Sequence, residues 1–407
     1  MKVDNCPNMP LSFLLAQLYM DSLVTKTTPK DVQTALGTLP KGLDNTYNEV
    51  MTRVDSQNDD YRILAQEVLS WVVYAVWPLS VEELQHALAV KPGVTQLDED
   101  DLPDKGTLIS VCAGLVIVDQ KSNVVRLVHH TTQKFLEEIH KDHLIDIHTE
   151  MATVCLTYLS FDIFGDWSPL DHLHSGMKTM SIYLRENTLL GYAARHWLQH
   201  VHAGSEENIK GLIVQFLKEE RKMWFCLQAK AVSELESDGH CTSSPPTTAF
   251  QFAIMTNLKE TVEEFLAGGV DVNAQGGEYA NPLQAASYSG HEQMVRLLFE
   301  KGADVNAQGG HFGNALQGAS CRGHEQVVRL LLEKGADVNA QGGYFGNALQ
   351  AASCGGHEQV VRLLLEKGAD VNAQGGHFSN ALQAASNEGH KQVVRLLLEN
   401  GAEVKVQ

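Results

Sequence analysis

The stretch HEQVVRLLL, residues 324–332, decides between two unrelated folds. Its first letters match the zinc-protease motif H-E-x-x-H, in which ligands at i and i+4 share one helical face. The fifth position is Val328, so the second histidine ligand is missing. Nearly the same letters return from His291, His357 and His390, always at an interval of 33 residues. A catalytic motif occurs once per site, whereas a structural unit recurs at a fixed period, so this stretch belongs to a repeat.

Five units of this period cover residues 246–407. Most continue into GHEQVVRLLLEKGADVNAQGG or a close variant, and they open with TAFQFA, NPLQAA, NALQGA, NALQAA and NALQAA at Thr248, Asn281, Asn314, Asn347 and Asn380. The period, with its order of helix, tight turn, helix and hairpin, resembles the ankyrin repeat, whose units open T-P-L-H-x-A and end G-A-D-V-N. Here Pro is kept only at Pro282, and Gln replaces His in every copy. The resemblance implies a solenoid that binds protein partners on its concave side.

The residue types within one unit suit such a stack. The inner helix carries small residues, and we expect the outer helix over 327–332 to be apolar almost all round because both neighbouring units cover it. Gly323 and Gly335 follow the two helices, where left-handed caps are expected. We expect His324 to hydrogen-bond locally, within the turn between the helices.

An aromatic residue recurs at the hairpin tips, which read GGEYA, GGHFG, GGYFG and GGHFS. Ankyrin hairpins usually carry a small or polar residue there. Two compatible interpretations follow: the rings pack each hairpin on the next, or they form part of a partner-binding strip. The inner-helix positions that vary between units would face the same side; they are Tyr288, Arg322, Cys354 and Glu388. The candidate binding residues are Tyr279, Tyr288, His311, Phe312, Arg322, Tyr344, Phe345, His377 and Phe378.

Composition excludes several classes of protein. The formal net charge is −19 and neither half of the chain is basic, which argues against binding to nucleic-acid phosphates. Seven scattered cysteines lack metal-ligand spacing and indicate reduced thiols, with no metal site. No secretory leader is evident, and the longest apolar run is about half a membrane span. We therefore expect a soluble cytoplasmic protein that does not enter a membrane.

Before the repeats, the pattern predicts three further segments. Residues 1–58 read as a helical connector, 59–145 as a winged helix and 146–240 as a helical spacer, with a Pro/Ser-rich linker over 233–248. In the winged helix, the pattern predicts a first helix over 61–75 and a second helix that begins at a capping box from Ser80 to Glu83. A short third helix and a two-stranded wing follow. Gly37 and Gly42 have P-loop spacing, but the Lys and hydroxyl residues are missing, so no nucleotide site is expected.

Three stretches of this part resemble the region after the NACHT ATPase core in fungal NACHT–ankyrin proteins. They read LPKGLDNTYNEVMTRV, VCAGLVIVDQKSNVVRLVHHTTQKFLEE and GYAARHWLQHV. The NACHT–ankyrin proteins are relatives of NOD-like receptors among the STAND signalling NTPases, and such a module is sometimes labelled after GPI inositol deacylases. The resemblance places His129 at the nucleotide-sensor position, with Gln133 and Phe135 matching and Lys134 replacing the family Glu. No ATPase core precedes the module here, so we also expect that the chain is a fragment of a longer, nucleotide-dependent switch.

The sequence thus predicts a mainly α protein: helical connector, winged helix and helical spacer, followed by an ankyrin solenoid. We expect a non-enzymatic interaction protein with no catalytic residues and no cofactor. DNA binding is a rival function, but its recognition-helix candidate KGTLISVCAG has a single basic residue, Lys105. An esterase is a second rival, but it would need a G-x-S-x-G motif, which the sequence lacks.

Overall fold

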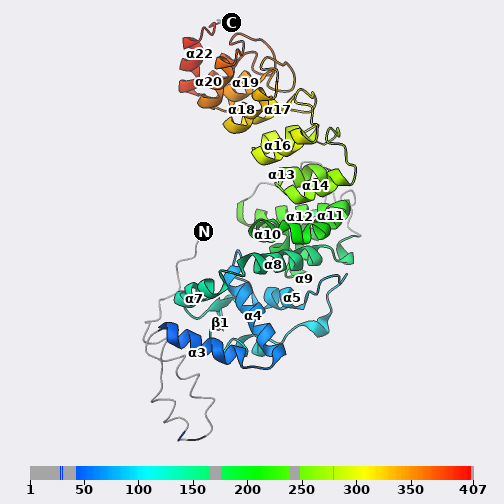
Figure 1. Ribbon diagram of the computed structural model, residues 1–407, viewed down its shortest axis with the longest axis vertical. Coiled ribbons are helices and arrows are strands. Elements are labelled where there is room, and N and C mark those ends of the chain that lie inside the picture. The colour runs from blue at the N-terminus through cyan, green and yellow to red at the C-terminus, as the bar shows by residue number, and fades with distance from the viewer. Residues whose placement is uncertain are drawn as a thin grey trace. The chain divides into compact units, whose positions relative to one another are not determined.

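A computed structural model describes residues 28, 30, 43–165, 176–238, 248–277 and 279–404. It confirms the mainly α prediction, because its strands form one small antiparallel sheet and nearly all its other regular elements are helices. Two compact units are present, one drawn from residues 1–212 and 219–241 and the other from 213–218 and 242–407 (Figure 1). Gly37, Gly42 and most of the predicted connector lie outside the described residues.

The winged helix is built as the sequence predicts. Its elements are α4 (Asp59–Tyr74), α5 (Val81–Ala89), η1 (Glu99–Asp101), α6 (Lys105–Ser110), β1 (Val116–Val118), β2 (Val125–Leu127) and α7 (His130–His140), and α3 (Leu43–Asp55) of the predicted connector precedes them. The capping box is present: Ser80 accepts a hydrogen bond from the Glu83 backbone N–H, and the Glu83 carboxylate accepts one from the Ser80 N–H at 2.7 Å. The wing pairs Ile117 with Arg126.

The remainder of the first unit is a helical layer. Its elements are α8 (Leu144–Leu159), η2 (Asp162–Phe164), α9 (Gly176–Glu186), α10 (Leu190–Ala203) and α12 (Glu220–Asp238). Helix α11 (Glu206–Lys218) is divided between the units, because residues 213–218 are assigned to the second one. Helix α10 packs against both α8 and α12. Tyr158, Tyr192 and Trp197 are buried, as their helical spacing predicts. The predicted linker was placed too early, because Ser233 lies in the last turns of α12, where it hydrogen-bonds to Arg195.

The second unit contains five helix pairs, one for each predicted repeat. They are α13 (Ala249–Met255) with α14 (Lys259–Ala267), α15 (Pro282–Ser289) with α16 (Glu292–Glu300), α17 (Ala315–Arg322) with α18 (Glu325–Glu333), α19 (Ala348–Cys354) with α20 (Glu358–Glu366), and α21 (Ala381–Asn387) with α22 (Lys391–Glu399). The first helices of successive pairs contact one another along the array (Figure 1). Gly323 (φ 74°) and Gly335 (φ 89°) adopt the expected left-handed conformation.

The expectation of an all-round apolar outer helix was wrong. In α18, Val327, Val328 and Leu331 are buried, but Gln326 and Arg329 are exposed. The neighbouring units therefore cover one broad face of this helix, and the opposite face meets solvent.

An asparagine in each hairpin joins successive units. Asn306 accepts a hydrogen bond from the Asp337 N–H at 3.0 Å and donates one to the Gly335 carbonyl at 3.1 Å. Asn273, Asn339 and Asn372 make the equivalent bonds, each to the unit that follows its own. These bonds fix the hairpin tips in register.

Candidate protein-binding surface of the repeats

Paired glycines shape each hairpin tip. In the third unit Gly342 (φ 154°) and Gly343 (φ 64°) precede the tip residues, and Gly342 pairs with Gly346 in a short antiparallel bridge. A methyl group on Gly343 would lie 2.5 Å from the Phe312 carbonyl carbon. Successive tips therefore touch at the level of the backbone.

One set of tip rings packs inward and forms a buried ring ladder, made of Tyr279, Phe312, Phe345 and Phe378. The first three side chains are only 6–8% exposed, and Phe378 is half-buried. The rings of Tyr279 and Phe312 stack at 6.0 Å, and those of Phe312 and Phe345 at 6.4 Å. The packing interpretation therefore accounts for these candidates.

The residues just before them form a second, exposed ring column, made of His311, Tyr344 and His377. All three side chains are exposed. Tyr344 stacks on His311 at 5.1 Å and on His377 at 4.8 Å, with interplanar angles of 19° and 18°. Backbone hydrogen bonds of 2.8 and 2.9 Å hold the three residues in line, from Tyr344 N–H to the His311 carbonyl and from His377 N–H to the Tyr344 carbonyl. The preceding equivalent, Glu278, lies outside the described residues.

The variable inner-helix residues Tyr288 and Arg322 adjoin the buried ring ladder. Tyr288 is half-buried and packs on Tyr279 at 5.1 Å and on Phe312 at 4.6 Å. The Arg322 guanidinium is exposed and lies 5.2 Å from the centre of the Tyr288 ring. This places one fixed cation beside the aromatic tips.

The histidines in the turns between the helices bond to the preceding unit, so the prediction of a bond within their own turn was wrong. The His324 Nε2 hydrogen-bonds the Tyr288 carbonyl of the preceding unit at 2.9 Å, so the bond is not local to its own turn. His291, His357 and His390 reach back to the preceding unit in the same way, over the same sequence separation. Burial lowers the pKa of His324, and the hydrogen bond to the Tyr288 carbonyl opposes this effect, because it also stabilises the protonated ring.

The glutamines that replace the family histidine tie the inner helix of a unit to the hairpin that ends the same unit, and this contact was not predicted from the sequence. Gln350 donates to the Gly375 carbonyl at 3.0 Å and to the Ser379 carbonyl at 3.1 Å, both in the hairpin of its own unit. Gln317 and Gln251 make comparable bonds. Gln stands at this position in all five units, and that recurrence was the available signal.

His129, the expected nucleotide-sensor residue, caps helix α7. Its Nδ1 accepts a hydrogen bond from the Thr131 N–H at 3.2 Å and contacts the Thr131 hydroxyl at 2.8 Å. Burial, and then the neighbouring His130, lower the pKa of its imidazole. The same ring lines a cavity of about 320 Å³ together with Arg126 and Gln133.

Within the described ranges, the chain shows few features of a metal, disulfide or membrane site. Over the described ranges, no group of three or more His, Cys, Asp or Glu side chains could hold a metal ion. The five cysteines in those ranges have free thiols. In this part of the chain no helix is long and apolar enough to span a membrane.

Comparison with known protein families agrees with this geometry. A model described as ankyrin repeats matches three times, at residues 202–309, 250–342 and 316–407. The matches together span just over half of the chain, which therefore belongs to the ankyrin-repeat family. A second model, described as the winged helix domain of GPI inositol-deacylase, matches residues 52–152. The protein thus combines a winged helix of that type with an ankyrin array, and the first ankyrin match begins ahead of the predicted boundary at 246.

One curated relative is similar over much of this arrangement. It is the azaphilone pigments biosynthesis cluster protein L of Monascus ruber, 30% identical over 298 residues. The similarity covers 65% of this chain and 60% of that protein, so the chain spans less than two thirds of its relative.

Proposed function

We propose that this chain is a non-enzymatic interaction protein whose ankyrin array binds a protein partner through the exposed ring column and the adjoining Tyr288–Arg322 pair. The observation that supports this is the contrast between the two sets of tip rings. The buried ring ladder packs the hairpins together, whereas His311, Tyr344 and His377 remain exposed and aligned.

The chemistry of these residues suits recognition of a protein. Aromatic and Arg side chains are enriched at the centres of protein interfaces, because they bury a large area at a low cost in side-chain entropy. Stacking has already fixed the orientation of the three rings. Binding would therefore lose little further conformational freedom.

The proposal is tested by replacing His311, Tyr344 and His377 together with Ala. A crosslinking amino acid placed at the exposed Glu388, the position equivalent to Arg322 two units further along, reports partner contact in cells that express the protein. We expect the crosslinked partner to be lost while the unfolding temperature changes little. The matched control replaces the exposed outer-helix residues Gln326, Gln359 and Gln392 with Ala and should keep the crosslink.

A complementary variant replaces Phe312, Phe345 and Phe378 with Ala. Since these rings pack between hairpins, it should lower stability by several kcal/mol, as deletion of buried aromatic rings does. The proposal would be contradicted if the partner were still captured by the variant that lacks His311, Tyr344 and His377. It would also be contradicted if the outer-helix control lost the partner to the same extent.

We infer in addition that the winged helix is a regulatory module of the STAND or NOD-like type. Its family match and the placement of His129 beside a cavity support this inference. Equilibrium dialysis with ADP tests the sensor role, and binding that His129→Gln weakens would support it. Full-length cDNA carrying an upstream, in-frame Gly-Lys-Ser/Thr loop would support the alternative that the chain is part of a nucleotide-driven switch.

Two other properties belong to the same proposal. We propose that the winged helix does not bind DNA: Lys105, the one basic residue of α6, donates a hydrogen bond to Asn123 of the wing at 2.8 Å. Weak, salt-insensitive retention in a gel-shift assay would support this view. We also propose a cytoplasmic location, on the basis of the scattered cysteines.

A further inference from the structure

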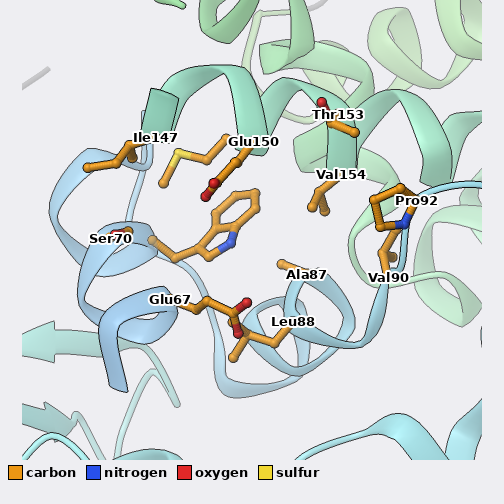
Figure 2. Close-up of a pocket in the computed structure, with 12 residues that line it drawn as sticks. Glu67, Ser70, Ala87, Leu88, Val90, Pro92, Ile147, Glu150, Thr153 and Val154 are labelled. Carbon is orange, nitrogen blue, oxygen red and sulfur yellow. The ribbon is translucent and has the colours of Figure 1, made fainter. Parts of the chain in front are cut away.

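The first unit contains a cavity of about 300 Å³ that the proposed function does not use. Helices α4, α5 and α8 and the segment after α5 enclose it (Figure 2). Most of its wall is apolar, with the residues Trp71, Ala87, Leu88, Val90, Pro92, Ile147, Met151 and Val154. A volume of this size lies at the lower end of the range for small-molecule sites.

The floor of this cavity is held rigidly. Trp71 is only 5% exposed, and its ring makes edge contacts with Tyr192 at 5.8 Å and with His200 at 6.3 Å. Helix α8, which carries the opposite wall, packs along α10. The apolar wall is therefore supported from behind and is suited to holding a hydrocarbon body in one place.

Two carboxylates supply the polar contacts. Glu67 projects from α4 and Glu150 from α8 toward the same space, and both remain accessible to solvent (Figure 2). In the described part of the chain, neither forms an ion pair with a Lys, Arg or His side chain. Burial, and then the Glu150 carboxylate, raise the pKa of Glu67, while burial and Asp146 raise the pKa of Glu150. The cavity thus concentrates negative charge that no ion pair offsets within the described residues.

We propose that this cavity binds a small organic cation, with its ammonium group between Glu67 and Glu150 and its hydrocarbon body against Trp71 and the apolar wall. A metal ion would leave the apolar wall empty, and a neutral apolar ligand would make no contact that uses the charge of the two carboxylates. An amphiphilic amine satisfies both halves of the site, because its N–H groups can donate to both carboxylates while its carbon skeleton is desolvated.

The experiment titrates the full chain with phenethylamine at physiological salt and follows binding by calorimetry. We expect a Kd of about 1 mM or tighter, as contacts from a ligand of this size allow. Phenethyl alcohol has the same carbon skeleton without the charge and should bind at least about tenfold more weakly, since it forms no charge-assisted hydrogen bond.

Protein variants distinguish this site from general attraction to an acidic chain. Glu67→Gln and Glu150→Gln should each weaken phenethylamine binding about tenfold, the effect of losing one charge-assisted contact. Both variants should fold, because each removes repulsion between neighbouring carboxylates. The matched control is Glu49→Gln, which removes an exposed charge from α3 outside the cavity and should leave the Kd unchanged.

Three outcomes would overturn the proposal. The first is equal binding of the amine and the alcohol, and the second is an equal Kd for the wild type and both cavity variants. The third is binding of an oligolysine peptide without binding of phenethylamine, which would assign the site to a side chain of a protein partner. None of these measurements depends on the ring column, so this proposal and the proposed function can fail separately.

Discussion

Histidines of the two units show how differently these parts of the molecule are built. In the array, His324 makes one hydrogen bond to the preceding unit, and three other histidines repeat it. In the first unit, His200 lies between His148, whose Nδ1 is 2.9 Å from its own, and the Tyr192 hydroxyl at 2.7 Å from its Nε2. The sequence marks the histidines of the array by their recurrence, although it does not reveal their bonding partner, whereas nothing recurrent marks His200.

The two units can also be observed separately. All five tryptophans of the chain lie before residue 230, within the residue ranges of the first unit. Tryptophan fluorescence therefore reports unfolding of the first unit, whereas far-ultraviolet circular dichroism reports helix loss in both. Each prediction below uses this separation.

The largest effect is expected from Gly343→Ala. Its methyl group would collide with the Phe312 carbonyl and force a left-handed residue at a contact between hairpins, at a cost of about 3 kcal/mol or more. The midpoint of urea unfolding followed by circular dichroism should move to a lower urea concentration, while the midpoint followed by fluorescence should not change. Gly335→Ala is the matched control: φ is also positive, but no atom lies within 4 Å of the added methyl, so it should cost only about 1 kcal/mol. Equal losses in the two variants would show that the hairpins do not touch as described.

Acid should weaken the first unit through His200. Burial, then His148 and His196, lower the pKa of His200 to about 3, whereas the unfolded chain titrates at its ordinary value. The unfolded state therefore binds the proton first as the pH falls below about 6.5, and the unit should lose about 2 kcal/mol between pH 7 and pH 5. Urea unfolding followed by fluorescence at several pH values measures this slope. His200→Asn should flatten it, and an unchanged slope would assign the acid sensitivity to other groups.

A smaller effect is expected from His324→Ala. It removes one inter-unit hydrogen bond and should cost about 1 kcal/mol, visible in the dichroism transition. The same substitution at His291 or His357 should cost a similar amount, because each makes the equivalent bond. A clear difference between these copies would mean that the units are less equivalent than their contacts indicate.

The smallest effect is expected from Arg329→Ala. The Arg329 guanidinium pairs with Glu325 at 2.7 Å on the exposed face of α18, and such surface pairs contribute roughly 0.5 kcal/mol or less. Neither transition should move measurably at physiological salt. A large loss would show that this face of α18 is buried in solution.

Particular residues show which structural features could be predicted from the sequence. The period of 33 residues, the capping box at Ser80 and the left-handed glycines are local patterns, and the structure confirms them. The bonding of His324 was predicted wrongly, because one unit read by itself cannot show that the nearest free carbonyl belongs to the unit before it.

The two rings of each hairpin tip show the same limit. His311 and Phe312 are neighbours in the chain, and the sequence placed both among the candidate binding residues. The packing of one hairpin on the next buries Phe312 and leaves His311 exposed, and this difference is visible only in the structure. The cavity between α4, α5 and α8 had no sequence signature at all, since Glu67 and Glu150 are far apart in the chain and come together only in the fold.

By itself, then, the sequence determined the elements, the repeat period and the ankyrin family, because caps, helical periodicity and turn glycines act over a few residues and recur in each unit. The tertiary structure decided which side chains meet: the back-bonded histidines, the exposed ring column and the carboxylates of the cavity. The physical reason is that burial and long-range hydrogen bonding depend on the packing of distant segments. No local pattern of residues records that packing.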